Sequence, residues 1–299
     1  MKVKLAATAG FCYGVERAVN MVYHEIEERG QSDGVYTLGP IVHNDMVVND
    51  LVSHGVKVIS DTSALKELAE SGRLSGKTVV IRAHGTGDEE RKLLSASGAR
   101  VIDATCPHVS RIHDIVREHH AKGELIVVTG SPDHPEVRGI LGCIGNDAMV
   151  IDDRAEAEKL LEDPPTLERF SGKTVCIVSQ TTFNLTKFED IVDIFKKKLY
   201  HTLVVNTICN ATQRRQMEAA ALSAECDAMI VIGGRNSSNT AKLFGICDSL
   251  CEATYFIQCL DDLKKVTIKD SVRCVGITAG ASTPKNIIEE VLNYVRTEF

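Results

Sequence analysis

Residues 2–22, KVKLAATAGFCYGVERAVNMV, hold the pattern on which the fold of this chain depends. A short apolar run is followed by a turn of small residues, then by Cys12, then by the spacing of an amphipathic helix. The same order returns in ARVIDATCPHVSRIHDIV (99–116) around Cys106 and in TLVVNTICNATQRRQMEAA (202–220) around Cys209. The cysteines are 94 and 103 residues apart, so the chain repeats with a period of about 100 residues.

Between these cysteines each repeat carries further short apolar runs, each followed by a polar turn and a helical pattern. In the first repeat they are VYTLGPIVHNDMV (35–47), VKVISDTSALKEL (56–68) and KTVVIRAHGTGDEERKLL (77–94). Short apolar strands alternating with helices predict parallel sheets covered on both faces. We therefore predict an α/β fold: three similar parallel-sheet domains in a pseudo-threefold trefoil around a central cluster cavity. The predicted domains are residues 14–106, 107–205 and 206–299, with the N-terminal strand (1–13) pairing into the third.

The bulk composition limits the classes of function. The chain has 299 residues and a net charge of −7, which argues against a general nucleic-acid or anionic-membrane surface. No apolar run is long enough to span a membrane. Lys2 and Lys4 give the start a faint likeness to a signal peptide, but Glu16 and Arg17 end the apolar run. We expect a cytoplasmic protein whose ten cysteines serve metal binding or packing.

The matched turn positions of Cys12, Cys106 and Cys209 favour metal binding over burial in the core, which is the usual place of a free cysteine. An iron–sulfur cube has four iron corners and cysteine is its usual ligand, so three cysteines leave one iron open as a Lewis acid. A structural zinc site is disfavoured because no Cys-x2-Cys pair exists. The remaining cysteines are predicted to pack in the core: Cys143, Cys176, Cys226, Cys247, Cys251, Cys259 and Cys274.

Polar turns before helices form the second candidate site. Their donors are His43, His84, His134, Thr181, Ser237, Ser238, Asn239 and Ser282. Backbone N–H groups at helix N-termini, hydroxyls and imidazoles together suit an anion such as a diphosphate. Two other interpretations stay open: Ser237, Thr181 and Ser282 as simple N-caps, and the histidines as structural hydrogen-bond partners.

Glu136 is the one carboxylate among these turns, two residues after His134. Near an anionic ligand in a partly dry cavity it would hold a proton and could deliver it. The alternative is an ordinary acidic residue favoured by a helix N-terminus.

Two other motifs are set aside: GRLSGKT (72–78) has the wrong spacing and strand order for a P-loop, and HDIVREHH (113–120) is predicted to be a solvated helix face.

Taken together, the motifs GFCYGVERAV, VHN, RAHG, DATCP, HPEVRG, SQTT, ICNAT, NSSN and TAGAS resemble the 4-hydroxy-3-methylbut-2-enyl diphosphate reductase family, in order, from about residue 3 to residue 295. The resemblance implies a [4Fe–4S] cluster on Cys12, Cys106 and Cys209. It implies that His43, His84, His134, Ser237, Ser238, Asn239 and Ser282 hold the diphosphate. Thr181 would lie near the substrate hydroxyl, and Glu136 would donate the proton.

The reaction implied is the last step of the methylerythritol phosphate route to isoprenoids. The allylic hydroxyl is removed with two electrons and two protons, giving isopentenyl and dimethylallyl diphosphate. A ferredoxin- or flavodoxin-type protein would supply the electrons. Two alternatives remain: a quinolinate-synthase-like condensing dehydratase, which needs no net electrons, and a non-catalytic iron–sulfur redox sensor. A sensor would need a DNA-binding or partner element, and neither a basic helix nor a helix-turn-helix signal is evident.

Overall fold

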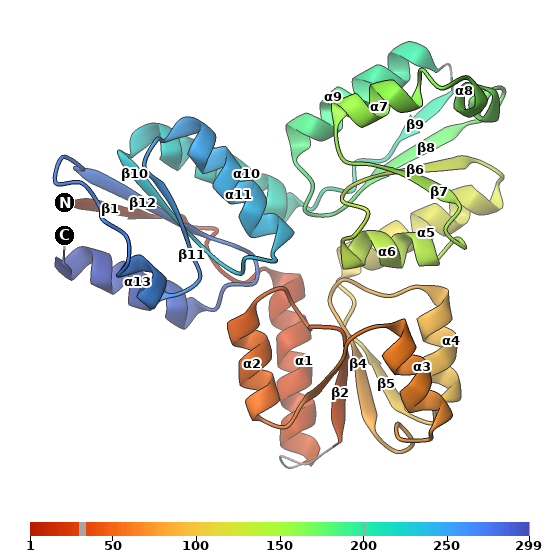
Figure 1. Ribbon diagram of the computed structural model, residues 1–299, viewed down its shortest axis with the longest axis horizontal. Coiled ribbons are helices and arrows are strands. Elements are labelled where there is room, and N and C mark those ends of the chain that lie inside the picture. The colour runs from red at the N-terminus through yellow and green to blue at the C-terminus, as the bar shows by residue number, and fades with distance from the viewer. Residues whose placement is uncertain (30–33, 200, 299) are drawn as a thin grey trace. The chain divides into compact units, whose positions relative to one another are not determined.

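The computed structural model describes residues 1–29, 34–199 and 201–298 (Figure 1). The chain divides into two compact units. Unit 1 comprises Met1–Arg17, Val42–Leu51 and Asn210–Phe299, and unit 2 comprises Ala18–Ile41 and Val52–Cys209. Among the described residues, no helix has both the length and the apolar character needed to cross a membrane.

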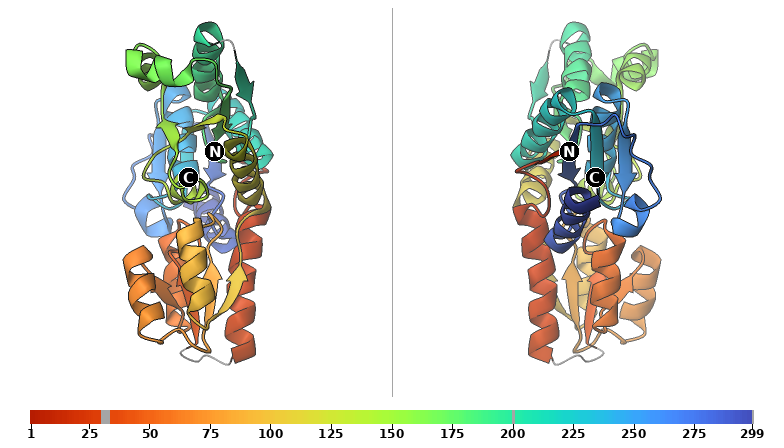
Figure 2. Two further views of the ribbon diagram at one scale, coloured as in Figure 1. Left: turned by 90° about the vertical axis from the view of Figure 1, so that its right-hand side faces the viewer. Right: turned by 90° about the vertical axis from the view of Figure 1, so that its left-hand side faces the viewer.

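Unit 1 contains one four-stranded parallel sheet with the order β1-β12-β10-β11. The strands are β1 (Lys2–Leu5), β12 (Cys274–Ala279), β10 (Ala228–Ile232) and β11 (Thr254–Ile257). The helices that follow are α10 (Asn210–Glu225), α11 (Ser238–Leu250), α12 (Leu260–Leu263) and α13 (Lys285–Glu298). β1 pairs with β12 from Lys2 opposite Cys274 to Leu5 opposite Ile277, so the first strand of the chain completes the last sheet (Figure 1). Both views of Figure 2 show the N-terminus close to the C-terminus in this unit.

Unit 2 contains two parallel sheets. The first has the order β3-β2-β4-β5 and the second the order β7-β6-β8-β9. The strands of the first are β3 (Lys57–Ile59), β2 (Val35–Leu38), β4 (Thr78–Ile81) and β5 (Arg100–Asp103). Those of the second are β7 (Ala148–Ile151), β6 (Leu125–Thr129), β8 (Val175–Ser179) and β9 (Thr202–Val204). In each sheet the strand that precedes a cysteine, β5 or β9, lies at an edge, as β1 does in unit 1.

Helices link the strands throughout. In order along the chain they are α1 (Tyr13–Arg29), α2 (Asp45–Ser53), α3 (Thr62–Glu70), α4 (Asp88–Ala96), α5 (Pro107–Ala121), α6 (Pro135–Gly142), α7 (Arg154–Leu160), α8 (Pro164–Phe170) and α9 (Leu185–Lys198). Three four-stranded parallel sheets with intervening helices confirm the predicted α/β class. The trefoil arrangement and the three domain boundaries stay predictions.

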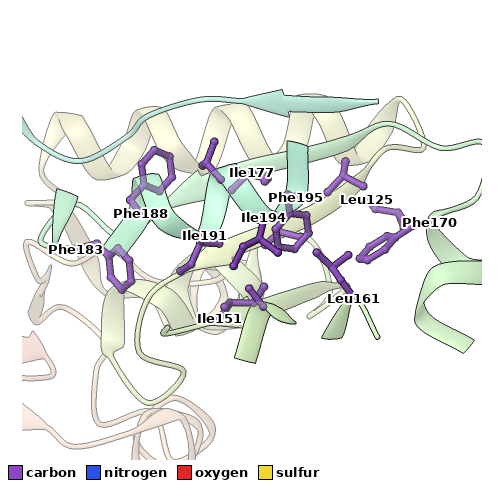
Figure 3. Packing of buried hydrophobic residues seen from close by; sticks show 14 of the residues in the cluster. Leu125, Ile151, Leu161, Phe170, Ile177, Phe183, Phe188, Ile191, Ile194 and Phe195 are labelled. Carbon is purple, nitrogen blue, oxygen red and sulfur yellow. The ribbon is translucent and has the colours of Figure 1, made fainter. Parts of the chain in front are cut away.

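Both faces of the sheets are buried, because alternate residues of one strand enter different cores. In β6, Leu125 and Val127 join the cluster shown in Figure 3, where the rings of Phe188 and Phe195 pack from α9. The intervening Ile126 packs instead with residues of α5 and α6. Because helices cover both faces of the sheets, the polar turns reach the surface at the ends of the strands.

Candidate active site

Each of the three cysteines is tied to a polar turn of its own sheet by a backbone hydrogen bond. The cysteine N–H donates to a carbonyl in the turn that follows the neighbouring strand. The bonds run from Cys12 to Ala281 (3.2 Å), from Cys106 to Ala83 (2.9 Å) and from Cys209 to Thr181 (3.0 Å). The sequence repeat is therefore also a repeat of local structure, with the same cysteine-to-turn contact in all three sheets.

The surroundings of these cysteines suit a metal site. Cys106 is the N-cap residue of α5, and Cys12 and Cys209 lie directly before α1 and α10. All three cysteines are half-buried and lie outside any disulfide, whereas five of the other cysteines are buried: Cys143, Cys176, Cys226, Cys247 and Cys251. A helix N-terminus stabilises an anionic sulfur, and partial exposure lets a metal reach it. The donor set therefore fits an iron–sulfur group.

The loop before Cys12 is held rigidly by α10. The buried guanidinium of Arg215 donates through Nε to the carbonyl of Thr8 (3.0 Å) and through Nη2 to the carbonyls of Thr8 (2.6 Å) and Gly10 (2.8 Å). The Glu218 carboxylate accepts the N–H groups of Ala7 (2.7 Å) and Thr8 (2.9 Å) from the same loop. These charge-assisted bonds fix the backbone that presents Cys12.

Unit 2 contains a buried acid–hydroxyl pair. The Glu136 side chain is 1% exposed at the start of α6, and Thr181 lies in the turn after β8. One carboxylate oxygen accepts the Thr181 backbone N–H at 2.6 Å, and the other accepts the Thr181 hydroxyl at 2.7 Å. The Thr181 carbonyl in turn accepts the Cys209 N–H. One turn thus connects a cysteine, a hydroxyl and a buried carboxyl group.

Two of the predicted histidines meet in unit 2. The rings of His84, after β4, and His134, before α6, contact edge to face with centroids 5.4 Å apart. His134 is also the N-cap of α6, and its Nδ1 accepts the Glu136 N–H at 3.2 Å. That bond requires an unprotonated Nδ1, so in this arrangement Nε2 carries the proton of the neutral ring.

The remaining histidine lies in unit 1. His43 Nδ1 is 2.7 Å from the carbonyl of Asn236, so this nitrogen donates and carries a proton. The Ser282 hydroxyl donates to the His43 carbonyl at 3.2 Å. A Cβ atom on Gly234 would lie 2.5 Å from that same carbonyl, so only glycine allows this close approach. The turns after β10 and β12 therefore pack directly on the His43 segment.

The N-terminus of α11 offers further donors. Ser237 is the N-cap and its hydroxyl accepts the Thr240 N–H at 3.3 Å, while Ser238 is the first helical residue. Asn239 is 5% exposed, and neither its Oδ1 nor its Nδ2 has a hydrogen-bond partner among the residues described. A buried amide without a partner costs about 1–3 kcal/mol, so this side chain is placed for a polar ligand.

The structure distinguishes between the roles that the sequence left open for the polar turn residues and for residues 113–120. Capping is confirmed for Ser237, but Thr181 binds Glu136 and Ser282 binds the His43 backbone. The prediction of a solvated face over 113–120 is wrong for His113, which is 2% exposed. His113 lies four residues after the buried Val109, in phase with the apolar stripe of α5, and that spacing was the available signal.

The fold and these side chains define the class: an α/β protein that carries cysteine and histidine, both possible metal ligands, in the turns at the ends of its parallel sheets. The chain belongs to the LytB protein family, whose model matches residues 3–296.

Known proteins are similar to this chain over nearly its whole length. A 4-hydroxy-3-methylbut-2-enyl diphosphate reductase from Caldanaerobacter subterraneus subsp. tengcongensis is 41% identical, over 99% of this chain and 97% of that protein. The enzyme of the same name from Clostridioides difficile is 39% identical over 99% of each. Among solved structures, the E-1-hydroxy-2-methyl-but-2-enyl-4-diphosphate reductase of Plasmodium falciparum matches with a TM-score of 0.85 at 27% identity, covering 99% of this chain and 87% of that one. A solved (E)-4-hydroxy-3-methyl-but-2-enyl diphosphate reductase, described as the terminal enzyme of the non-mevalonate pathway, matches with a TM-score of 0.66 at 36% identity over 99% of each chain.

Proposed function

We propose that this chain catalyses the reductive removal of the allylic hydroxyl of 4-hydroxy-3-methylbut-2-enyl diphosphate, the terminal step of the methylerythritol phosphate route. The hydroxyl oxygen takes one proton and leaves as water. The carbon skeleton takes two electrons and a second proton at either of two carbons, giving isopentenyl or dimethylallyl diphosphate. Family membership and the names of relatives about 40% identical over nearly the whole chain support this activity.

The observation that carries the proposal is the buried Glu136–Thr181 pair. Glu136 is the proton donor, and both of its oxygens are oriented by Thr181. The Thr181 hydroxyl donates to the carboxylate form of Glu136. When Glu136 holds a proton, the same hydroxyl oxygen can accept a hydrogen bond from the acid and turn its own O–H towards the oxygen of the substrate hydroxyl. A proton from the carboxylic acid form of Glu136 can thus reach the leaving oxygen directly or through Thr181 Oγ1.

Cys12, Cys106 and Cys209 are proposed as the ligands of one [4Fe–4S] cluster, which when bound supplies single-electron transfer and an iron without a protein ligand that can act as a Lewis acid. Their matched positions, their absence from disulfides and their half-buried state support this role. The electrons come from a ferredoxin- or flavodoxin-type protein in the cytoplasm.

The diphosphate is assigned to the donors of the polar turns. These are His43, His84, His134, Ser237, Ser238, Asn239 and Ser282. The α11 N-terminus offers backbone N–H groups and a favourable dipole to the phosphate oxygens. The unpartnered Asn239 amide supports this assignment most directly, because a ligand would satisfy both of its polar atoms.

The test is anaerobic purification, iron and sulfide analysis, and turnover of the allylic diphosphate with a strong one-electron reductant. Glu136→Gln should keep the iron content yet lower kcat by about 10²- to 10⁴-fold, the usual range for loss of a proton donor. Glu158→Gln, at an exposed carboxylate paired with Arg154, is the matched control and should leave kcat unchanged. Near-normal turnover by Glu136→Gln would remove Glu136 from this role. Chemistry that proceeds without reductant would favour the condensing-dehydratase alternative.

The ligand assignment has its own control. Serine at any one of Cys12, Cys106 or Cys209 should cost most of the bound iron and sulfide. Cys259→Ser changes a thiol that is also free and half-buried, and should leave the iron content as it was. If a ligand variant kept its iron and its turnover, that cysteine would be excluded.

A further inference from the structure

Two further cysteine sulfur atoms lie close together in unit 1. They lie at the amino ends of the strands, whereas the polar turns follow the carboxyl ends. Cys226 follows α10 just before β10, and Cys274 is the first residue of the neighbouring strand β12. Their Sγ atoms are 3.2 Å apart, and both thiols are free. The polar turns with Ser237 and Ser282 follow the carboxyl ends of these same two strands, so the sulfur pair is not part of the site described above.

Hydrogen bonds hold the two backbone segments that carry these cysteines side by side. The Asp227 carboxylate accepts the N–H groups of Arg273 and Cys274, each at 2.8 Å. The Asp227 N–H donates to the Cys274 carbonyl at 2.9 Å. A disulfide needs sulfurs about 2.05 Å apart, so closing this gap takes an approach of about 1 Å. Side-chain rotation can supply that movement without breaking the strand pairing.

Access and reactivity differ between the two thiols. Cys274 is half-buried, whereas Cys226 is 8% exposed. Burial raises the pKa of Cys226 to about 12, and the hydrogen bond and charge of Cys274 add to the rise, against the nearby Lys4, which lowers it. The first attack on an oxidant therefore comes from Cys274. Once Cys274 is oxidised it no longer bonds to Cys226 or carries charge, which removes two of the causes that hold Cys226 in its thiol form.

We propose that Cys226 and Cys274 are a reversible dithiol–disulfide pair, a redox modification site that takes a small disulfide such as glutathione disulfide as its oxidant. The Cys274 thiolate attacks one sulfur of glutathione disulfide, forms a mixed disulfide and releases one glutathione. The Cys226 thiolate then attacks the Cys274 sulfur and releases the second glutathione. Two protein thiols are oxidised, one small disulfide is reduced to two thiols, and the two thiol protons pass to the released glutathione. The product links adjacent strands β10 and β12 within one sheet.

The sequence makes the test unambiguous. Trypsin releases Cys226 in QMEAAALSAECDAMIVIGGR (216–235) and Cys274 in CVGITAGASTPK (274–285), and each peptide holds a single cysteine. The cluster-loaded protein is treated anaerobically with glutathione disulfide, its remaining thiols are alkylated, and non-reducing digests are read by mass spectrometry. We expect these two peptides as one linked species that dithiothreitol separates.

Cysteine-to-serine variants test the order of the two steps. Cys226→Ser should leave Cys274 as a stable glutathione adduct, and Cys274→Ser should leave Cys226 unmodified. Cys247→Ser, at a buried thiol of the adjoining core, should leave the linked species at its parent level. If the parent protein yields only the Cys274–glutathione adduct, or links either cysteine mainly to another partner, the proposal is wrong. Peptide linkage is read without turnover, so the result is separate from the proposed reductase activity.

Discussion

Replacing His113 with glutamine should make the protein less sensitive to acid, by an amount that follows from the burial of the imidazole. The ring is 2% exposed on α5, and among the described residues its Nε2 has no hydrogen-bond partner. The pKa of His113 is lowered from 6.5 to about 4, mainly by burial and also by the charges of Arg117 and Arg91, while Asp103 and Asp114 act in the opposite direction. His113 is therefore neutral in the folded protein at pH 7.

The sign of the pH effect follows from linkage. Because the folded pKa lies below the unfolded one, the unfolded chain binds the proton first as the pH falls. Stability is therefore full above pH 6.5 and is lost as the pH falls from 6.5 towards 4. At about 1.4 kcal/mol per pKa unit the whole loss is about 3 kcal/mol, of which about 2 kcal/mol is reached by pH 5.

The measurement is the urea dependence of unfolding at pH 7 and pH 5, with parent and His113→Gln proteins at matched iron content. The free energy of unfolding of the variant relative to the parent should improve by about 2 kcal/mol at the lower pH. His24→Gln changes a histidine whose side chain is 65% exposed and should move this difference by less than about 0.5 kcal/mol. Parallel pH profiles for parent and His113→Gln would refute the assignment of a buried neutral imidazole.

Three further substitutions probe the frame of the site. Gly85→Ala forces alanine into φ +72°, with its Cβ 2.8 Å from a ring atom of the adjacent α5, and should cost at least about 2 kcal/mol in chemical denaturation. Arg215→Met leaves the carbonyls of Thr8 and Gly10 without a donor and should cost about 3 kcal/mol and lower the iron content, while Arg215→Lys should recover part of both; unchanged iron in the methionine variant would contradict the role given to this loop. Phe195→Ala empties a fully buried site and should cost about 3–5 kcal/mol by urea titration with kcat retained in the folded fraction.

The sequence predicted which turns matter, because a strand–turn–helix period can be read from apolar spacing alone. It placed a cysteine after one strand of each repeat and polar turns after others, and the structure shows that the strand before each cysteine lies at the edge of its sheet. It did not predict that Thr181 donates twice to Glu136, 45 residues earlier in the chain. Periodicity fixes the turn a side chain occupies, but the partner of that side chain depends on how α6 packs against the end of β8.

The same limit explains the two other differences. Cys226 and Cys274 were predicted as core residues from their apolar neighbours, and Cys226 is buried, but their contact depends on the pairing of β10 with β12. His113 was predicted to be solvated together with the rest of residues 113–120, because the histidines of this tract lack the i, i+4 spacing of a metal site. His119 and His120 do pair with acidic groups, Glu124 and Asp147, whereas His113 belongs to the apolar stripe three positions before Val116.

The backbone bond from each cysteine to the turn beside it has a thermodynamic consequence. In the proposed enzyme this bond joins a cysteine assigned to the cluster with a turn assigned to the diphosphate site, which would make the two occupancies interdependent. By reciprocity, whatever the metal group contributes to the affinity for diphosphate, bound diphosphate must contribute equally to retention of the metal group. Protein saturated with an unreactive diphosphate should therefore surrender its iron to a chelator more slowly than the ligand-free protein.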